Sequence, residues 1–239
     1  RDIGVTGVQT CALPIFSWVG GTLVALRTGG KTPTQIVVYD TSNPDPSVTW
    51  SRRTLVVGSP LDWADHSALV EPALLEVTSR DGHTLHARLY RSPRSNGRLL
   101  CWVHGGPTDQ WQVTFMPRLN YWVDRGYDVL VPDHRGSTGF GRNYTQQLRG
   151  RWAELDVDDV ADVLVSCDRD PHRVALIGSS AGGLNVLVLA SRHPGLASAV
   201  VTAYPVTDIA ALDDGTHRFE AHYNRSLVGD PHVTAIASL

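Results

Sequence analysis

The sequence is poor in cysteine and methionine, and it lacks long apolar runs and a large excess of one charge. Three cysteines in 239 residues argue against a disulfide framework and a zinc site, and they favour a reducing, cytoplasmic compartment. No apolar run approaches the roughly 18 residues of a membrane-spanning helix, so none is predicted. A net charge of −3 with scattered basic residues argues against nucleic acid and anionic membranes as partners.

The first residues do not have the pattern of a native start. The only methionine is Met116, so we expect further sequence to precede Arg1. Residues 5–15 resemble the conceptual translation of a common sequencing adapter, and we therefore treat residues 1–15 as an artefact outside the fold. A secretory signal is the alternative interpretation, but the segment has no basic stretch beyond Arg1 and no sustained apolar region.

A G-x-S-x-G pentapeptide, formed by Gly178, Ser180 and Gly182, stands between an apolar run and a helical pattern. Residues 174–177 are apolar without alternation, as in a strand buried on both faces of a parallel sheet, and residues 181–192 have helical spacing. A sharp strand-to-helix turn leaves no room for side chains beside the serine, which explains the glycines. The pattern indicates a nucleophile elbow with Ser180 as the nucleophile; a strand–helix turn without chemistry is the alternative.

A second motif, His-Gly-Gly-Pro at residues 104–107, follows another apolar strand. Acyl transfer needs donors aimed at the oxygen that becomes negative, and the backbone of a glycine loop can approach it without hindrance. The residue after the nucleophile supplies a second donor, so we assign the oxyanion hole to Gly106 and Ala181. We expect His104 and Gly105 to support the loop, and His104 to transfer no proton, because the base follows the serine in this architecture.

A third segment combines a strand that starts at residue 127 with a glycine-rich loop. We expect Asp133 and Arg135 to form an ion pair that fixes this loop, with neither residue acting in catalysis. The loop also needs positive φ at three glycines. These are Gly136, Gly139 and Gly141.

The order of strands and helices from residue 99 onward predicts a parallel α/β sheet. Helical spacing covers residues 115–125 and 155–165. An acidic run that includes Glu154 and Asp156 opens the second of these helices, near the positive end of its dipole. We interpret this run as a solvated first turn rather than a metal site.

Shorter strands are predicted upstream. Residues 73–79 and 84–90 should form a hairpin at the antiparallel edge of the sheet. Residues 22–27 and 35–39 form a predicted antiparallel pair, and residues 53–58 are the candidate next strand. This pair is typical of the final blade of a β-propeller.

Four motifs occur together in the region from about residue 74 to the end. They are His-Gly-Gly-Pro at 104–107, Pro-Asp-His-Arg-Gly-Ser-Thr-Gly-Phe-Gly-Arg at 132–142, Trp-Ala-Glu-Leu-Asp-Val-Asp-Asp at 152–159 and Gly-Ser-Ser-Ala-Gly-Gly at 178–183. With them the chain resembles the prolyl oligopeptidase family of serine peptidases, most closely its acylaminoacyl-peptidase and dipeptidyl-peptidase branches. The resemblance implies an α/β-hydrolase fold behind a β-propeller that restricts access to short or unfolded peptides, with no cofactor or metal.

The resemblance divides the chain into an artefact at 1–15, the end of a propeller and a linker at 16–62, and an α/β-hydrolase domain at 63–239 that is truncated at its C-terminus. In this fold the acid and base follow the serine, and the resemblance places both beyond Leu239. The acidic and histidine residues that follow Ser180 lack the strand-end setting of triad members. They are Asp208, Asp213, Asp214, Asp230, His193, His217, His222 and His232.

The predicted function is that of a serine peptidase with an acyl-enzyme on Ser180. We expect the chain as given to be inactive without its acid and base, although the intact gene product is an enzyme. A carboxylesterase-like hydrolase and a non-catalytic α/β-hydrolase that binds a ligand remain as alternatives. The propeller-like segment favours the peptidase, and the sequence assigns no oligomeric state.

Overall fold

The computed structural model describes residues 16–43, 45, 47, 49–58, 69–209, 212 and 223–228. The predicted artefact at residues 1–15 lies outside the described residues, and so do residues 59–68, which span the predicted boundary between the linker and the hydrolase domain. Several residues that the sequence excluded as triad members also lie outside them. These are Asp213, Asp214, Asp230, His217, His222 and His232.

The first sheet is antiparallel and contains four strands in the order β1-β2-β3-β4. Its strands are β1 (Phe16–Val19), β2 (Thr22–Gly29), β3 (Thr32–Asp40) and β4 (Arg52–Val57). The predicted pair and the next strand are confirmed, and β1 adds a fourth strand that pairs with β2 across a turn at Gly20, where φ is +56°. Leu26 and Ile36 on this sheet remain exposed, as expected of a propeller blade that packs between neighbouring blades.

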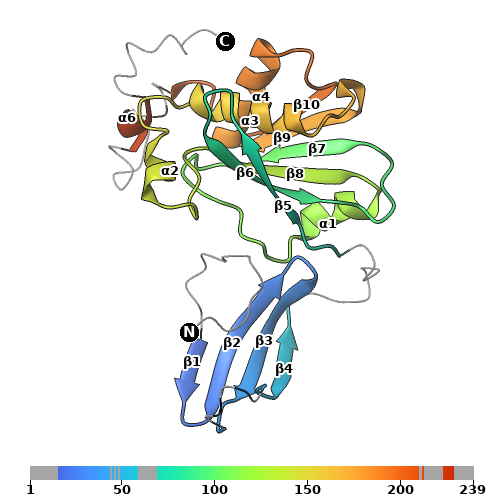
Figure 1. The fold of residues 1–239 in the computed structure, drawn as a ribbon, viewed down its shortest axis with the longest axis vertical. Coiled ribbons are helices and arrows are strands. Elements are labelled where there is room, and N and C mark those ends of the chain that lie inside the picture. Colours follow the sequence, from blue (N-terminus) through green and yellow to red (C-terminus); the bar gives the residue numbers. More distant parts are fainter. Residues whose placement is uncertain are drawn as a thin grey trace.

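The second sheet has six strands in the order β10-β9-β7-β8-β6-β5 (Figure 1). These are β5 (Ala73–Thr78), β6 (Thr84–Tyr90), β7 (Leu99–Val103), β8 (Asp128–Asp133), β9 (Val174–Ser179) and β10 (Ala199–Ala203). Strands β7 to β10 are parallel, whereas β6 pairs antiparallel with β8, and β5 with β6. The hairpin is therefore the predicted antiparallel edge, and the loops after β7, β8 and β9, which carry the motifs, start from the same edge of the sheet.

Helices connect and cover the strands of the second sheet. They are α1 (Pro117–Asp124), α2 (Arg142–Gln146), α3 (Leu155–Ser166), α4 (Ala181–Arg192) and α6 (Tyr223–Val228), with a 3-10 turn at Pro171–Arg173. The predictions of α3 and α4 are confirmed. Helix α1 begins at Pro117 rather than at residue 115, because proline is favoured at the first helical position, where its missing N–H costs nothing.

Two hydrophobic clusters fill the space on the two sides of the second sheet. Strand β7 contributes Leu99, Cys101 and Val103 to the cluster that contains α3 and α4, and Leu100 and Trp102 to the cluster that contains α1. This division follows from the alternation of side chains along a strand. All of β7 is buried, so the glycine loop extends from a strand that is covered on both faces.

The start of α3 corrects one prediction. Glu154 is exposed, but Asp156 and Asp159 are buried. Both carboxylates share a helix face with Val160 and Val163, because residues three or four apart lie above one another, and that face packs on the core. The acidic run is therefore not a solvated first turn.

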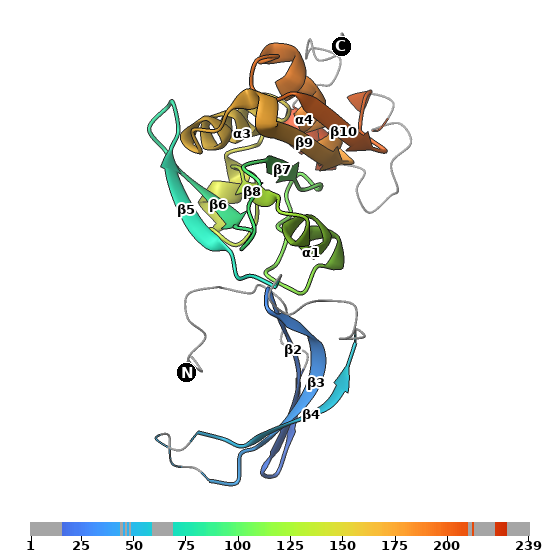
Figure 2. The ribbon, with the colours of Figure 1, turned by 90° about the vertical axis from the view of Figure 1, so that its right-hand side faces the viewer.

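Hydrogen bonds between described residues connect the first sheet to the second part of the chain. The N–H of Lys31 donates to the Glu71 carboxylate at 2.9 Å, and the N–H of Phe115 donates to the Thr28 hydroxyl at 3.0 Å. Both bonds come from the end of the first sheet where β2 turns into β3, which Figure 2 shows next to α1 and the start of β5.

Candidate active site

Ser180 occupies a strained turn between β9 and α4. Its φ of 54° and ψ of −125° lie in a region that residues with a Cβ atom seldom adopt, at a cost of about 1–3 kcal/mol. Four backbone hydrogen bonds hold this conformation, and two of them join the Ser180 carbonyl to the N–H groups of Gly183 and Leu184 in α4. The Ser180 N–H donates to the Ala203 carbonyl at 3.2 Å, and the Val206 N–H donates to the Ser180 carbonyl at 3.3 Å. The elbow is therefore fixed to the end of β10 and the loop that follows.

The turn fits only because glycines surround it. A Cβ atom at Gly178 would overlap the carbonyl group of Gly182, and a Cβ atom at Gly182 would lie 2.5 Å from the carbonyl oxygen of His104. Backbone atoms cannot rotate away from such a contact as a flexible side chain can. The steric requirement expected at both glycines is met, and the elbow packs directly on the end of β7.

The glycine loop after β7 lies against Ser180. A Cβ atom built on Gly105 would be 3.6 Å from the Cβ atom of Ser180. Gly106 adopts a φ of +122°, and Ala181 is the first residue of α4, so its N–H has no partner within the helix. Backbone N–H groups therefore lie in the neighbourhood of Ser180, where stabilisation of an oxyanion needs them.

His104 is fully buried and bonds to the loops around it. Its Nδ1 lies 2.7 Å from the Gly105 carbonyl and therefore donates, which leaves Nε2 to accept from the Ser137 hydroxyl at 2.8 Å. The ring stacks on His134 with centroids 4.6 Å apart. Burial, and then the neighbouring His134, lowers the pKa of His104 to about 3, so the ring is neutral near pH 7. These contacts support a role for His104 in holding the loop rather than in taking a proton from Ser180.

The buried His104 predicts that acid weakens the fold. Its pKa is about 3 in the folded chain against an ordinary value of 6.5, so the unfolded chain binds the proton first, and stability is lost as pH falls from about 6.5 to about 3. We expect the free energy of unfolding, measured by urea titration across this interval, to fall less steeply in a His104→Gln variant than in the parent protein.

The variant has to be compared with the parent protein, because other titrating groups raise the stability of the fold as pH falls. Burial raises the pKa of Asp133 and Asp156, so their protonation favours the folded state as pH falls. Both carboxylates are present in the parent and in the variant, and the difference in slope therefore isolates His104. Equal slopes in the two proteins would contradict the assignment.

The ion pairs of the loop after β8 differ from the prediction. Asp133 and Arg135 do not pair with each other: Asp133 pairs with Arg88 of β6 at 2.6 Å, and Arg135 pairs with Asp159 of α3, also at 2.6 Å. Arg135 contacts a second carboxylate, Asp81 in the β5–β6 turn, at 2.7 Å, and this contact holds the pKa of Asp81 well below its usual range. The two side chains thus connect the loop to separate elements instead of closing it on itself.

Sequence reasoning missed Arg88 and Asp159 as supports of the site. Arg88 also donates to the carbonyl of Trp111, so one side chain joins the end of β8 to the segment after the glycine loop. A third buried contact links α4 to α3, where the Asn185 amide donates to the Asp156 carboxylate at 3.0 Å. The ion-pair partners are 45 and 24 positions apart, and no local pattern could have matched them.

No described residue hydrogen-bonds to the Ser180 hydroxyl, and the described histidines are engaged or lie elsewhere. His104 and His134 are both buried. His104 makes the bonds given above, and Nδ1 of His134 lies 2.9 Å from the backbone carbonyl of Arg135. His193 is the C-cap of the 12-residue α4, about 18 Å from the elbow, which agrees with its exclusion from a triad. Of the other described histidines, His83 lies 3.3 Å from the Asp81 carboxylate, His86 stacks on Phe140, and His172 precedes β9 at its amino end.

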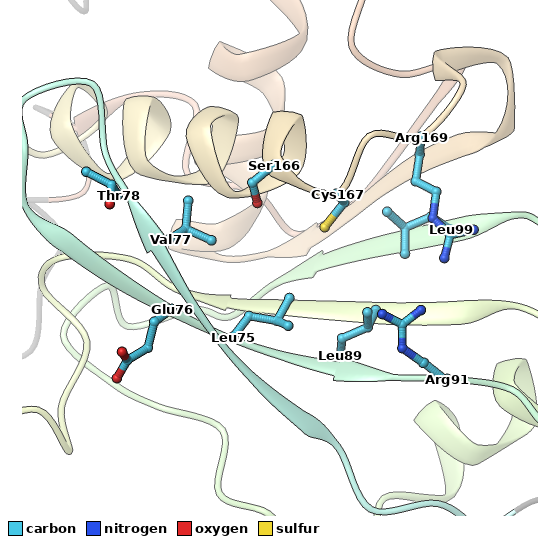
Figure 3. Close-up of a pocket in the computed structure, with 10 residues that line it drawn as sticks. All are labelled: Leu75, Glu76, Val77, Thr78, Leu89, Arg91, Leu99, Ser166, Cys167 and Arg169. Atoms are coloured by element: carbon cyan, nitrogen blue, oxygen red, sulfur yellow. The ribbon is translucent and has the colours of Figure 1, made fainter.

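A cavity of about 530 Å³ lies between β5 and the end of α3 (Figure 3). Its lining includes Leu99, the first residue of β7, and Cys167, which follows α3. Both residues are at the amino end of the parallel strands, opposite to the edge that carries Ser180. The cavity is therefore separate from the candidate site. Burial raises the pKa of the Cys167 thiol, which keeps the thiol in the unreactive protonated form.

In the part of the chain that the structure describes, no helix combines the length and apolar character needed to span a bilayer. Over the same residues, no three His, Cys, Asp or Glu side chains are grouped as ligands of a metal ion. The candidate site consists of Ser180 and the backbone groups that surround it.

Known proteins resemble the chain in sequence and in structure. The profile described as the prolyl oligopeptidase family matches residues 113–234. The acylamino-acid-releasing enzyme of Rattus norvegicus is 35% identical over 220 residues, which are 90% of this chain and 28% of that protein. Dipeptidyl aminopeptidase BIII of Pseudoxanthomonas mexicana is 29% identical over 198 residues, or 77% of this chain and 27% of that protein. The chain thus spans less than a third of the length of these relatives.

The structural comparison agrees. A puromycin-hydrolysing peptidase of Mycobacterium tuberculosis superposes with a TM-score of 0.79 at 25% identity, over 90% of this chain and 34% of that one. The family profile covers more than half of the chain, including α3, β9, the elbow and α4. With a mostly parallel α/β-hydrolase sheet behind a blade-like antiparallel sheet, and an elbow within the matched region, the chain belongs to the prolyl oligopeptidase family.

Proposed function

We propose that this chain supplies the nucleophile and the oxyanion hole of a serine peptidase that hydrolyses short peptides. Ser180 Oγ attacks the peptide carbonyl, and the N–H groups of Gly106 and Ala181 bind the oxygen that becomes negative. When the tetrahedral intermediate collapses, the C–N bond breaks, the amine leaves with the proton that the base removed from Ser180, and an acyl-enzyme remains on Ser180. Water then hydrolyses this ester, which releases the acid and restores the Ser180 hydroxyl. The observation that carries the proposal is the strained Ser180 backbone in contact with the glycine loop.

A base must remove the Ser180 proton, because a serine hydroxyl is a weak nucleophile near neutral pH. We assign this task to an Asp–His pair outside the described residues, since the described histidines are engaged in other bonds or distant from the elbow. Ala181 lies at the positive end of the α4 dipole, which adds to the stabilisation of the negative oxygen. The mechanism uses no metal and no cofactor.

Two observations support a peptide substrate. The relatives are named as an acylamino-acid-releasing enzyme, a dipeptidyl aminopeptidase and a puromycin-hydrolysing peptidase. The blade-like sheet β1–β4 is consistent with a propeller, which would limit entry to short or unfolded peptides.

The free Cys101 and Cys167 support a cytoplasmic location.

A carboxylesterase-like hydrolase is the second candidate, because an elbow with a glycine loop serves any acyl transfer. The two enzymes differ in the leaving group, which is an amine for a peptidase and an alcohol for an esterase. The third candidate is a binding module that has kept the elbow but lacks a base. Each of the three predicts a different result in one experiment.

The experiment is labelling with a fluorophosphonate, which forms an ester with an activated serine and releases fluoride. The protein is expressed with any sequence that flanks this chain in its gene. We expect mass spectrometry of its peptides to place the adduct on Ser180, and we expect peptide p-nitroanilides to be hydrolysed. Hydrolysis of p-nitrophenyl esters alone would favour the esterase, and the absence of any adduct would favour the binding module.

A further inference from the structure

The residue that follows the glycine loop is bonded twice to a single tyrosine on α6. The N–H of Thr108 donates to the Tyr223 hydroxyl at 3.1 Å, and the hydroxyl oxygens of the two residues are 2.6 Å apart. A phenol oxygen that accepts from an N–H can still donate its own proton to the Thr108 hydroxyl. One side-chain oxygen on α6 thus holds both the backbone and the side chain of Thr108.

Thr108 lies close to Gly106 in the chain and in space. Only Pro107 separates the two residues, and its ring fixes φ, so this link is short and stiff. A Cβ atom built on Gly106, whose φ is +122°, would lie 2.9 Å from the Thr108 nitrogen. The chain therefore folds back on itself at Gly106, and a shift of Thr108 would move the Gly106 N–H.

Helix α6 is anchored in the core rather than on the loop that it holds. The Trp152 N–H donates to the Leu227 carbonyl at 3.3 Å. Leu227 and Val228 are buried in the hydrophobic cluster that contains α3 and α4, and Tyr223 packs against the same cluster. The core therefore sets the position of the Tyr223 hydroxyl independently of the glycine loop.

The loop after β8 supports the same backbone at two other points. The Ser137 hydroxyl bonds to His104 at 2.8 Å, and the Thr138 N–H donates to the Asp109 carbonyl at 3.0 Å. These bonds hold the chain two residues before and three residues after Gly106. The tyrosine on α6 acts one residue closer to Gly106 than the bond at Asp109 does.

An oxyanion hole stabilises the transition state only when its donors are fixed before the reaction. A donor must lie about 2.7–3.1 Å from the oxygen that becomes negative, and the loss of one donor costs about 10²- to 10³-fold in kcat. We propose that Tyr223 is a positioning residue of the oxyanion hole, whose hydroxyl fixes the Gly106 N–H by holding Thr108. The inference rests on the proposed function. Tyr223 acts through Thr108 rather than by contact with the reacting atoms.

Tyr223→Phe tests the proposal in the protein expressed with its flanking sequence, because this change removes one oxygen atom and keeps the ring. The substrates are peptide p-nitroanilides that end in Phe or in Ala. We expect kcat to fall by about 10-fold with KM within about 2-fold of the parent, because the negative oxygen forms only after the substrate has bound. The loss should be similar on both substrates, since the oxyanion is the same for every acyl side chain.

Fluorophosphonate labelling gives a second measure of the same oxyanion hole. The phosphoryl oxygen of the reagent gains negative charge where the carbonyl oxygen of a substrate would. Labelling of Ser180 in the Tyr223→Phe variant should therefore be slower than in the parent by about the same factor as kcat.

Substitutions of Thr108 test whether the effect passes through this residue. Thr108→Ser keeps the hydroxyl and the N–H, so kcat should stay near the parent value. Thr108→Val keeps the N–H bond and loses the hydroxyl bond, so its loss should be smaller than that of Tyr223→Phe. The double variant of Tyr223→Phe and Thr108→Val should lose no more than Tyr223→Phe alone, because both changes break the same contact.

Tyr144→Phe is the matched control. It also removes a buried tyrosine hydroxyl, which donates to the carbonyl of Asp133 at the end of β8 at 2.6 Å. All activities are measured well below the thermal unfolding midpoints, so that loss of folded protein does not lower kcat. We expect Tyr144→Phe to lower the midpoint and keep kcat, whereas an equal loss of kcat in this control would mark the effect of Tyr223→Phe as a general response of the fold.

Other outcomes would also overturn the inference. Unchanged kcat and an unchanged labelling rate in Tyr223→Phe would remove it. A rise in KM, or a loss that differs between the two substrates, would make Tyr223 a contact of the substrate instead of a support of the loop. Losses that multiply in the double variant would place the effect outside the contact with Thr108. Failure of the parent protein itself to react with the fluorophosphonate would overturn the proposed function, and this inference with it.

Discussion

Replacement of Ser180 with alanine should reduce peptide hydrolysis by about 10⁴-fold or more, because removal of the nucleophile from a serine hydrolase leaves only what binding and the oxyanion hole provide. The substitution removes one oxygen atom and leaves the elbow in place. The hydrogen bonds that fix this turn come from the backbone of residue 180 rather than from its side chain. The measurement is kcat/KM on a peptide p-nitroanilide for the protein expressed with its flanking sequence, with circular dichroism to compare the folds.

Ser179 offers a matched control. It is the last residue of β9, directly before the nucleophile, and it has the same side chain. A Ser179→Ala variant should keep activity and fluorophosphonate labelling, whereas Ser180→Ala should lose both. A Ser180→Ala variant that retained its activity would remove the basis of the proposed mechanism.

The second large effect is expected at Asp159. Its carboxylate is fully buried and accepts hydrogen bonds from the Arg135 side chain at 2.6, 2.9 and 3.1 Å, and from the Arg135 N–H at 2.8 Å. Asp159→Asn leaves the buried guanidinium with only the half-exposed Asp81 as a charged partner. Breaking a buried pair in this way costs about 3–5 kcal/mol, and we expect a loss of that order in the free energy of unfolding from urea titration.

The same helix provides the control for this experiment. Asp162, three residues along α3, pairs with Arg80, whose side chain is 46% exposed. The Asp162 side chain is 15% exposed, but the Arg80 guanidinium stays in contact with solvent when its partner is lost, so Asp162→Asn should change the free energy of unfolding less than Asp159→Asn. Similar losses for the two variants would contradict the view that burial gives the Arg135–Asp159 pair its importance.

The loss at Asp159 should also affect the site. Arg135 is the second residue after β8, in the loop that carries Ser137, and the Ser137 hydroxyl donates to His104 beneath the glycine loop. A loop released from α3 would loosen that support. The measurement is the activity of the Asp159→Asn variant at temperatures well below its unfolding midpoint, where we expect lower activity than in the parent protein.

Features with short-range determinants were predicted well. The helix over 181–192 matches α4 at both ends, and the helix over 155–165 matches α3 to within one residue. The positive φ values predicted at Gly136, Gly139 and Gly141 are present. Turn chemistry and hydrophobic spacing depend on a few neighbouring residues, so a sequence pattern contains them in full.

Burial and pairing of charged residues were predicted poorly. Asp156 was expected in solvent, and Asp133 and Arg135 were expected to pair with each other, but all three are buried against partners from other elements. A charged residue in the sequence shows only that its side chain needs either solvent or a partner of opposite charge. It does not show which distant segment will supply the partner.

The sequence by itself determined the parallel α/β order, the glycine-flanked Ser180 and the adjacent helix, because these depend on periodicity and on steric limits within a few residues. Only the tertiary structure decided that the glycine loop touches Ser180, that Arg88 and Asp159 support the loops, and that the end of β10 holds the Ser180 backbone. Those features arise where strands far apart in the chain become neighbours. Their energies depend on distance and burial, and both are set by the packing of the whole sheet rather than by any local pattern.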